Sequence, residues 1–305
     1  QDDIDMKISS YIANSVLSAS TLSLLLYAAG SHAAALDVSQ SPLMLVDSVA
    51  PNLLFTLDDS GSMEFAYAPD GLSDKNFKVN GVTVCPNDNN GCRGTRRAKS
   101  SHFNPLYYNP DVEYVIPKKA DGTFYSTSFT SAPWNGFKGG DTVNLSSEYR
   151  PVWNNDWSGG TKYALHPSQD FNNTSTGVHA YYYVYDESLS NCPKQKHDDR
   201  CYKKMEPSTD AEKQNFATWY SFYRTRGLAT ISAAHLAFYE LPSSIRLSWQ
   251  RINGDQDQLS DNFGIYSQSN KNKFFTWLKN NSSFSGSTPL RRAMTRAGSF
   301  LSTNE

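Results

Sequence analysis

The chain has 305 residues, which is enough for one or two domains. Its formal net charge is -2, with acidic and basic residues mixed along the sequence, and this argues against DNA or RNA as a partner. Hydrophobic residues make up 38% of the chain and aromatic residues 13%, enough to bury a core. Long stretches rich in Asn, Ser, Thr, Gly and Tyr indicate a loop-rich extracellular protein.

The first 35 residues have the pattern of an export signal. A positively charged start precedes an apolar run over 16–29, and the small residues Ala33 and Ala35 fit cleavage after the second of them. Residues 1–5 are interpreted as a misassigned start. The alternative is a membrane anchor, but a span needs about 20 apolar residues, and serine and threonine interrupt this run. We therefore expect the protein to be exported.

Four cysteines form two local pairs in the sequence, Cys85 with Cys92 and Cys192 with Cys201. An even number of cysteines at short spacing predicts disulfides in an exported protein. Each bridge would stabilise the fold by about 2–3 kcal/mol, because it restricts the unfolded chain. A zinc site is the alternative, although neither pair has C-x-x-C spacing and only His197 lies close by.

Residues 53–57 form a nearly continuous apolar run that ends at the polar sequence DDSGS at 58–62. Apolar residues without alternation are typical of a parallel strand that is buried on both faces. We predict such a central strand over 53–57, followed by a polar loop.

Regular periodicity is lost between residues 64 and 207, where aromatic residues are mixed with Asn, Gly and Pro. Short apolar runs bounded by these residues predict small strands and turns, among them a turn at Asp121-Gly122. We interpret residues 64–207 as a large irregular insertion, mostly of strands and loops, placed after the first strand.

A capping box at Thr209 and Glu212 begins the next helical pattern, which we expect to run as one long amphipathic helix to Pro242. Its inward positions are predicted to be Phe216, Trp219, Tyr220, Tyr223, Ile231, Ala234 and Phe238.

Further strands and helices are predicted after Pro242. Alternation over 245–249 indicates a half-buried strand, residues 263–266 indicate a short one, and 271–279 has helical spacing. The sequence GSTPL at 286–290 opens a last helix, with the proline suited to its first turn. The positions expected to face inward on that helix are Leu290, Ala293, Met294, Ala297 and Leu301. This order of elements predicts an open α/β sheet with its binding site at the carboxyl ends of the strands.

Two of the polar loops resemble those of a known domain family. The pattern Asp58-x-Ser60-x-Ser62 is similar to the D-x-S-x-S signature of von Willebrand factor A (vWA) domains, and 286–290 is similar to their later G-x-T-P-L loop. The resemblance implies a Rossmann-like α/β domain with a metal-ion-dependent adhesion site (MIDAS). Ser60, Ser62 and Thr288 would bind Mg²⁺, or another divalent cation such as Mn²⁺ or Ca²⁺, and Asp58 would hold a coordinated water.

The chemistry of such a site suggests its ligand. Mg²⁺ prefers about six oxygen ligands, and hydroxyls are neutral, so the ion remains electron-poor until a carboxylate from a partner completes its shell. We therefore expect an acidic, carboxylate-bearing surface or host ligand. The family takes a further Asp from the next core strand, which we expect beyond Glu305. The vWA domain, residues 36–63 and 208–305, is accordingly interpreted as incomplete at its C-terminus.

Longer motifs resemble the PilY family of proteins found at the tips of type IV pili. They are FNPLYYNP at 103–110, DGT-x-Y at 121–125, VNLS at 143–146, YRPVW at 149–153 and NFA-x-WYSFYRTR at 215–226. The resemblance implies a secreted protein at the pilus tip or outer membrane of a Gram-negative bacterium. It would associate with minor pilins and support pilus biogenesis, adhesion and twitching motility. A C-terminal β-propeller is expected in the full-length protein, outside these 305 residues.

Two other functions fit the same sequence. One is a structural or force-sensing tip module with a vestigial metal site. The other is a carbohydrate-binding module that would use Trp134, Trp153 and Trp157. Catalysis is not expected. Residues 59–61 are similar to the nucleophile segment of trypsin-like proteases, but G-x-S-x-G is not met and no His stands in a catalytic context.

Overall fold

The structure is a computed structural model that describes residues 50–303, apart from 75–76, 86–91, 157–159, 168–169, 172–175 and 255–262. The chain separates into two compact units, Gln1–Val49 and Ala50–Glu305, and the described residues all belong to the second. The predicted export signal and Trp157 lie outside the described residues. None of the helices in the described part has the length and apolar character of a membrane span.

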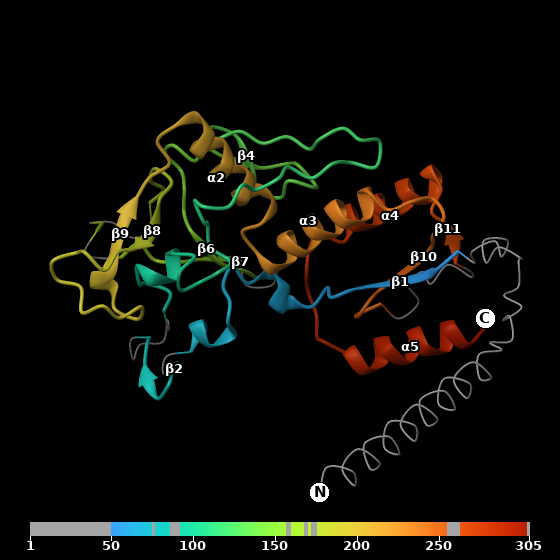
Figure 1. Cartoon of the computed structure of the whole chain (residues 1–305), viewed down its shortest axis with the longest axis horizontal. Helices are drawn as coiled ribbons and strands as arrows, with labels where there is room; N and C mark the ends of the chain where they lie inside the picture. The colour runs from blue at the N-terminus through green and yellow to red at the C-terminus, as the bar shows by residue number, and fades with distance from the viewer. Residues whose placement is uncertain are drawn as a thin grey trace, which may run out of the picture. The chain divides into compact units, whose positions relative to one another are not determined.

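A three-stranded sheet forms the centre of the α/β part (Figure 1). It contains β1 (Asn52–Leu57), β10 (Arg246–Arg251) and β11 (Gly264–Ile265), in the order β1-β10-β11. β1 and β10 are parallel, with Asn52 opposite Arg246, and β11 is antiparallel to β10. The three predicted strands and the parallel character of the first are confirmed.

The position of β1 in the sheet differs from the prediction of a central strand. Among the described strands it pairs with β10 alone, and Leu53 near its start is 38% exposed. Burial increases along the strand until Leu57 is fully buried. β1 is therefore an edge strand among the described strands. Its apolar composition reflects the helices that pack on its two faces, because no second described strand covers its other edge.

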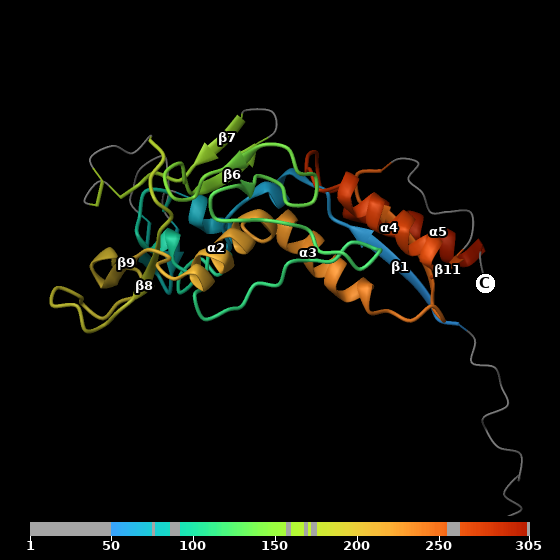
Figure 2. The ribbon, with the colours of Figure 1, turned by 90° about the horizontal axis from the view of Figure 1, so that it is seen from above.

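Helices lie on both faces of the sheet. α3 (Arg226–Tyr239) and α4 (Gln268–Asn280) cover one face and α5 (Leu290–Thr303) the other (Figure 1). Figure 2 shows α3 and α4 running along β1. The arrangement is of the α/β class, as expected.

The face under α3 and α4 is packed with aromatic side chains. Phe55 of β1 meets Phe274 edge to face, with ring centroids 5.4 Å apart, and Phe274 also packs against Trp249 of β10. The four apolar side chains predicted on α4 are all buried, and their burial stabilises the fold by roughly 1.5–3 kcal/mol each.

The face under α5 is polar yet buried, which differs from the predicted half-buried strand. Ser248 and Gln250 of β10 are inaccessible to solvent, because α5 covers them. The Gln250 amide donates to the carbonyl of Ala293 at 3.1 Å and to the Thr56 hydroxyl at 3.1 Å.

The inward face predicted for α5 is partly wrong. Ala293, Ala297 and Phe300 are buried against the sheet. Leu290, Met294 and Leu301 are exposed by 57%, 58% and 44%. The helix carries apolar residues on two adjoining faces, and small alanines allow the closest approach to the polar side of β10, so that face turns inward.

The long helix expected from Thr209 to Pro242 is two helices, and this expectation is wrong. α2 (Asp210–Phe222) ends at Tyr223, and α3 begins after Thr225, whose hydroxyl accepts from the backbone N–H of Leu228. The capping box at Thr209 and Glu212 is present as predicted. All the predicted inward residues except Tyr223 are buried, because the break keeps both apolar faces directed at a core.

The insertion consists of two-stranded sheets and loops, as predicted, together with short 3₁₀ helices that were not predicted. Its strand pairs are β2 (Lys78–Val79) with β3 (Val82–Thr83), β4 (Ala132–Pro133) with β5 (Thr142–Val143), β6 (Val152–Asp156) with β7 (Gly160–Tyr163), and β8 (Tyr182–Tyr185) with β9 (Tyr202–Met205). Its 3₁₀ helices include η3 (Asp70–Ser73), η4 (Arg97–Lys99) and η5 (Asp199–Cys201). The predicted turn at Asp121-Gly122 is confirmed, with Gly122 at φ +88°. α2 packs into the aromatic core of this region through Phe216, Trp219 and Tyr220.

Candidate functional site

The DDSGS loop leaves the carboxyl end of β1 and turns at once into the 3₁₀ helix η2 (Gly61–Glu64). Asp58 Oδ1 accepts hydrogen bonds from the backbone N–H of Ser60 at 2.9 Å and from its hydroxyl at 2.5 Å. The hydroxyl oxygens of Ser60 and Ser62 lie 3.2 Å apart. Three of the predicted site residues thus form one connected cluster of oxygen atoms.

The loop between α4 and α5 lies directly against this cluster. Gly61 N–H donates to the carbonyl of Gly286 at 3.1 Å, and Ser285 N–H donates to the carbonyl of Asp59 at 2.9 Å. A third contact is made by Glu64, whose carboxylate accepts from Phe284 N–H at 2.9 Å. The two segments that were predicted to converge are therefore joined through their backbones.

Thr288 lies in the same loop, two residues after Gly286, with its side chain exposed. Its carbonyl accepts from Leu290 N–H at 2.9 Å. Within the described part of the chain, no hydrogen bond joins the Thr288 hydroxyl to either serine. The structure places the fourth predicted residue near the cluster without bringing it into contact.

Asp59 anchors the site, a role that its place in the DDSGS sequence did not predict. Its Oδ1 accepts from the backbone N–H and the side-chain amide of Asn253, both at 3.0 Å, and its Oδ2 lies 3.7 Å from Arg251. Asn253 follows the end of β10, so this carboxylate ties the ends of two parallel strands together. Neighbouring parallel strands that both end in polar residues are the signal that could have revealed the pair.

Gly286 is the residue that lets the second loop approach so closely. Its φ is +104°, and a Cβ at this position would lie 3.1 Å from Asn253 Oδ1. Only glycine adopts this backbone conformation at little cost. The glycine of the GSTPL sequence thus has a structural role beside Asn253.

The oxygen cluster fits a hard divalent cation. Adjacent oxygens in an octahedral Mg²⁺ shell of about 2.1 Å radius are about 3 Å apart, close to the separation of the two serine hydroxyls. Asp58 already accepts a hydrogen bond from Ser60, so it could orient a hydroxyl or a water in such a shell. Among the described residues, no group of three or more His, Cys, Asp or Glu side chains could hold a metal ion. The candidate site differs from such groups because most of its predicted ligands are serine and threonine hydroxyls.

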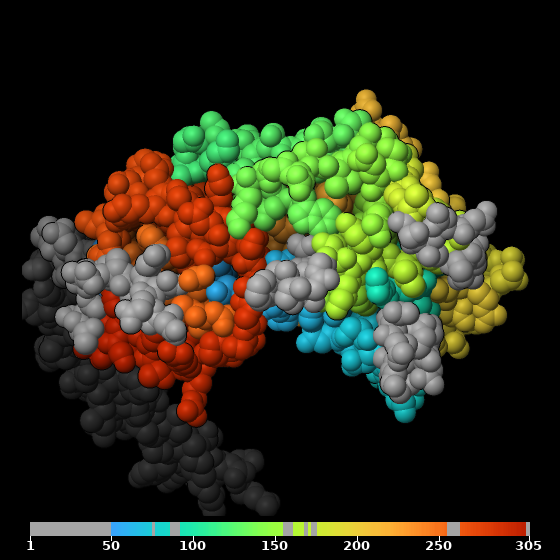
Figure 3. Space-filling view, turned by 180° about the vertical axis from the view of Figure 1, so that it is seen from behind, coloured from blue at the N-terminus to red at the C-terminus, as the bar shows by residue number. Residues whose placement is uncertain are grey.

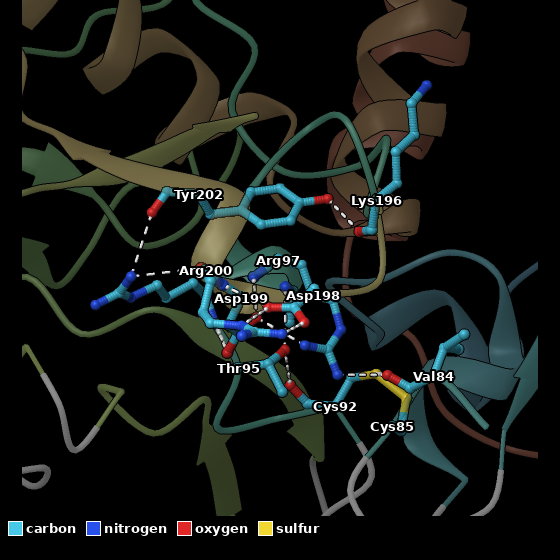
Figure 4. A network of polar contacts seen from close by, with 12 residues as sticks. Val84, Cys85, Cys92, Thr95, Arg97, Lys196, Asp198, Asp199, Arg200 and Tyr202 are labelled. Carbon is cyan, nitrogen blue, oxygen red and sulfur yellow. Dashed lines mark hydrogen bonds and ion pairs between the residues drawn. A yellow bond between two sulfur atoms is a disulfide. The ribbon is translucent and has the colours of Figure 1, made fainter. Parts of the chain in front are cut away.

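Both predicted disulfides are present, Cys85–Cys92 and Cys192–Cys201, with Cα atoms 4.8 and 4.5 Å apart. Arg97 connects the two bridged loops (Figure 4). Its guanidinium donates to the carbonyl of Val84, beside the first bridge, and to Asp199 Oδ1 at 2.7 Å, inside the second loop.

A buried lysine adds further hydrogen bonds to this network. Lys99 donates to the carbonyls of Arg93 at 3.0 Å and Thr95 at 2.9 Å, and burial lowers its pKa to about 7. The network fixes the insertion around its disulfides. Because all four cysteines are bonded to one another in pairs, none of them is available as a zinc ligand.

Two of the three tryptophans proposed for sugar binding, Trp134 and Trp153, are described, and they do not form a shared exposed surface. Trp153 is buried and stacks on Tyr67, with ring centroids 4.3 Å apart. Trp134 is half-buried and lies against the guanidinium of Arg224. Burial therefore makes Trp153 unavailable for stacking on a sugar, and the guanidinium of Arg224 covers one face of Trp134.

Comparison with curated proteins finds close relatives. The chain is 43% identical over 307 residues to "Type IV pilus biogenesis factor PilY1" of Pseudomonas aeruginosa strain UCBPP-PA14, a match that covers 95% of this chain and 24% of that protein. It is 41% identical over 297 residues to the PilY1 protein of strain PAK, covering 91% of this chain and 23% of that protein.

The chain thus spans about a quarter of the length of the curated relatives it matches. No family model matches it, and no solved structure matches it. The identity extends along nearly the whole chain, through the insertion as well as the α/β part, so the resemblance seen in its longer motifs is confirmed. This chain belongs to the PilY family.

Proposed function

We propose that this chain is part of an exported, non-enzymatic protein of the type IV pilus tip that binds surfaces or partners through a metal ion held at the DDSGS loop. The ion, Mg²⁺ or a similar divalent cation, would be bound by Ser60, Ser62 and Thr288, with Asp58 acting through a water. An acidic ligand would complete the shell. Association with minor pilins, pilus assembly and twitching motility belong to the same proposal.

One observation carries the proposal: the two predicted ligand loops, more than 220 residues apart in the sequence, are hydrogen bonded to each other at the carboxyl end of β1. Two serine hydroxyls already lie at a separation suited to one cation. The names of the relatives support a role in pilus biogenesis. Thr288 lies two residues after Gly286 in this loop, and its side chain is exposed.

We expect divalent cations to raise the melting temperature of the protein. A cation at about 100 times its Kd stabilises the folded state by about 2.7 kcal/mol, which corresponds to a rise of roughly 5–10 °C for a domain of this size. Ser60→Ala and Ser62→Ala should each remove most of that rise, because each deletes a ligand. Thermal unfolding with Mg²⁺, Mn²⁺ or Ca²⁺, and again with EDTA, measures the effect.

Ser287→Ala is the matched control, since it removes a hydroxyl from the same loop but outside the predicted ligand set. Its cation response should equal that of the unchanged protein. The same substitutions in the full-length protein connect the site to function through surface attachment and twitching. If the serine variants keep the cation response, or if chelation alters neither stability nor attachment, the metal mechanism is wrong. Normal adhesion by these variants would instead support a structural tip module.

A further inference from the structure

Arg224 is a buried cation whose hydrogen-bonding capacity is largely unused. It follows α2, is only 2% exposed, and lies between the rings of Trp134 and Tyr220, with its guanidinium carbon 4.3 and 4.5 Å from their centroids. One guanidinium nitrogen donates to the carbonyl of Tyr220. Nε is shielded from solvent and has no hydrogen-bond partner among the described residues, and the carboxylate of Glu64 lies close enough to favour the charged guanidinium. A guanidinium has five N–H donors, and a buried one is costly when they are not satisfied.

A cavity of about 360 Å³ adjoins this arginine. Its walls come from the loop that joins β4 to β5, from the start of α3 and from residues 282–284. Asn135 fixes one wall by donating to the carbonyl of Ser282 at 3.0 Å, and Lys138 fixes the rim by donating to the hydroxyl of Ser283 at 2.8 Å. In Figure 3 the green chain of the insertion lies against the red chain between α4 and α5. The cavity is therefore bounded by the insertion on one side and the α/β part on the other.

The charges around the cavity select one kind of ligand. Arg224 and Lys138 are positive, while Glu64 and Asp141 also line the walls. Glu64 accepts from Phe284 N–H, so it is held in place. The two carboxylates repel a phosphate dianion about twice as strongly as they repel a ligand of charge -1, so a single carboxylate is the better fit to the arginine. A carboxylate also accepts stronger hydrogen bonds from a guanidinium than a neutral amide does.

We infer that this cavity binds the side-chain carboxylate of an acidic peptide segment, with Arg224 as the buried anion-binding residue and Lys138 at the entrance. The aromatic ring of Trp134 would cover the methylene groups of the bound side chain. This site is separate from the metal cluster and needs no cation. It gives the protein a second means of recognising acidic partners.

The test uses the 305-residue chain in EDTA, so that metal cannot contribute. Isothermal titration compares the peptide acetyl-Gly-Glu-Gly-amide with its glutamine counterpart and with inorganic phosphate. We expect the glutamate peptide to bind about tenfold more tightly than the glutamine peptide, since the charged hydrogen bonds are lost in the latter. Phosphate should neither bind nor compete.

Two variants locate the site. Lys138→Met should weaken binding of the glutamate peptide several-fold, while Lys273→Met, which removes an exposed lysine from α4 outside the cavity, should leave it unchanged. Arg224→Lys keeps the charge but loses the planar guanidinium with its several N–H donors, and should abolish the preference for glutamate. If that variant does not fold, Lys138→Glu provides the second measurement, because reversing the rim charge should weaken binding further than Lys138→Met.

Equal affinity for the two peptides, or no binding at millimolar concentration, would show that the cavity holds only water and would overturn the inference. Binding that appears only when Mg²⁺ replaces EDTA would also overturn it, while supporting the proposed metal site. Binding in EDTA that depends on Lys138 would support the proposed carboxylate site in the cavity, even if the proposed metal site proves wrong.

Discussion

Replacing Gly227 by alanine is expected to lower the free energy of unfolding by about 2–3 kcal/mol, the usual cost of overpacking a rigid core. Gly227 lies in the first turn of α3, where an added Cβ would be 2.0 Å from the ring of Phe284. That ring is only 1% exposed, so it has little room to move. Urea unfolding followed by circular dichroism measures the change.

Gly298→Ala supplies the matched control, because it makes the same substitution in α5 at a position where, apart from the adjoining residues and the backbone of the helix itself, no described atom lies within 4 Å of the new Cβ. Alanine favours a helix over glycine by about 0.5–1 kcal/mol, so this variant should be more stable than the unchanged protein. Opposite signs for two helical glycines can come only from the difference in packing. Two stabilising results would mean that Phe284 moves aside freely.

The position of Gly227 also links the helix break to the candidate site. Phe284 N–H donates to Glu64, and the next residue, Ser285, donates to Asp59. A displaced Phe284 would pull on the loop that carries the predicted Thr288. Gly227→Ala should therefore weaken the response to divalent cations as well as the stability, while Gly298→Ala should not.

The sequence was most informative where one residue pattern has one structural solution. The short apolar run before DDSGS indicated a strand, and Thr209 with Glu212 marked the start of α2 to the residue. The two loops of the candidate site were identified from their resemblance to a known family, and their backbones do meet. Local signals of this kind need no knowledge of distant contacts.

Other features depend on contacts that no local pattern reveals. α5 has apolar residues on two faces, and only the polar side of β10 decides which one turns inward. The break between α2 and α3 lies inside a continuous helical period, and it exists because the two halves pack on different cores. The pairing of Asp59 with Asn253 joins residues 194 positions apart.

His235 of α3 is a buried group whose aromatic surroundings no local sequence pattern reveals. It is inaccessible to solvent, stacks on Phe137 at 4.7 Å between ring centroids and meets Phe275 edge to face. One ring nitrogen contacts the carbonyl of Ile231 at 2.9 Å, and the other lies 3.4 Å from the Tyr125 hydroxyl. Burial lowers the pKa of His235 from 6.5 to about 4.

Acidification from pH 7.5 to pH 4.5 is expected to remove about 2–3 kcal/mol of stability through this histidine alone. The unfolded chain takes up a proton near pH 6.5, whereas the folded protein keeps the ring neutral until about pH 4, so stability falls between these values. Glutamine in the His235→Gln variant cannot take up that proton. Between pH 7.5 and pH 4.5 the variant should therefore lose about 2–3 kcal/mol less unfolding free energy than the unchanged protein. Buried His166, whose pKa is also lowered by burial, remains in both proteins and cancels in the comparison. Equal acid sensitivity of the two proteins would mean that water reaches His235, and that α3 is packed less tightly against the insertion than the structure shows.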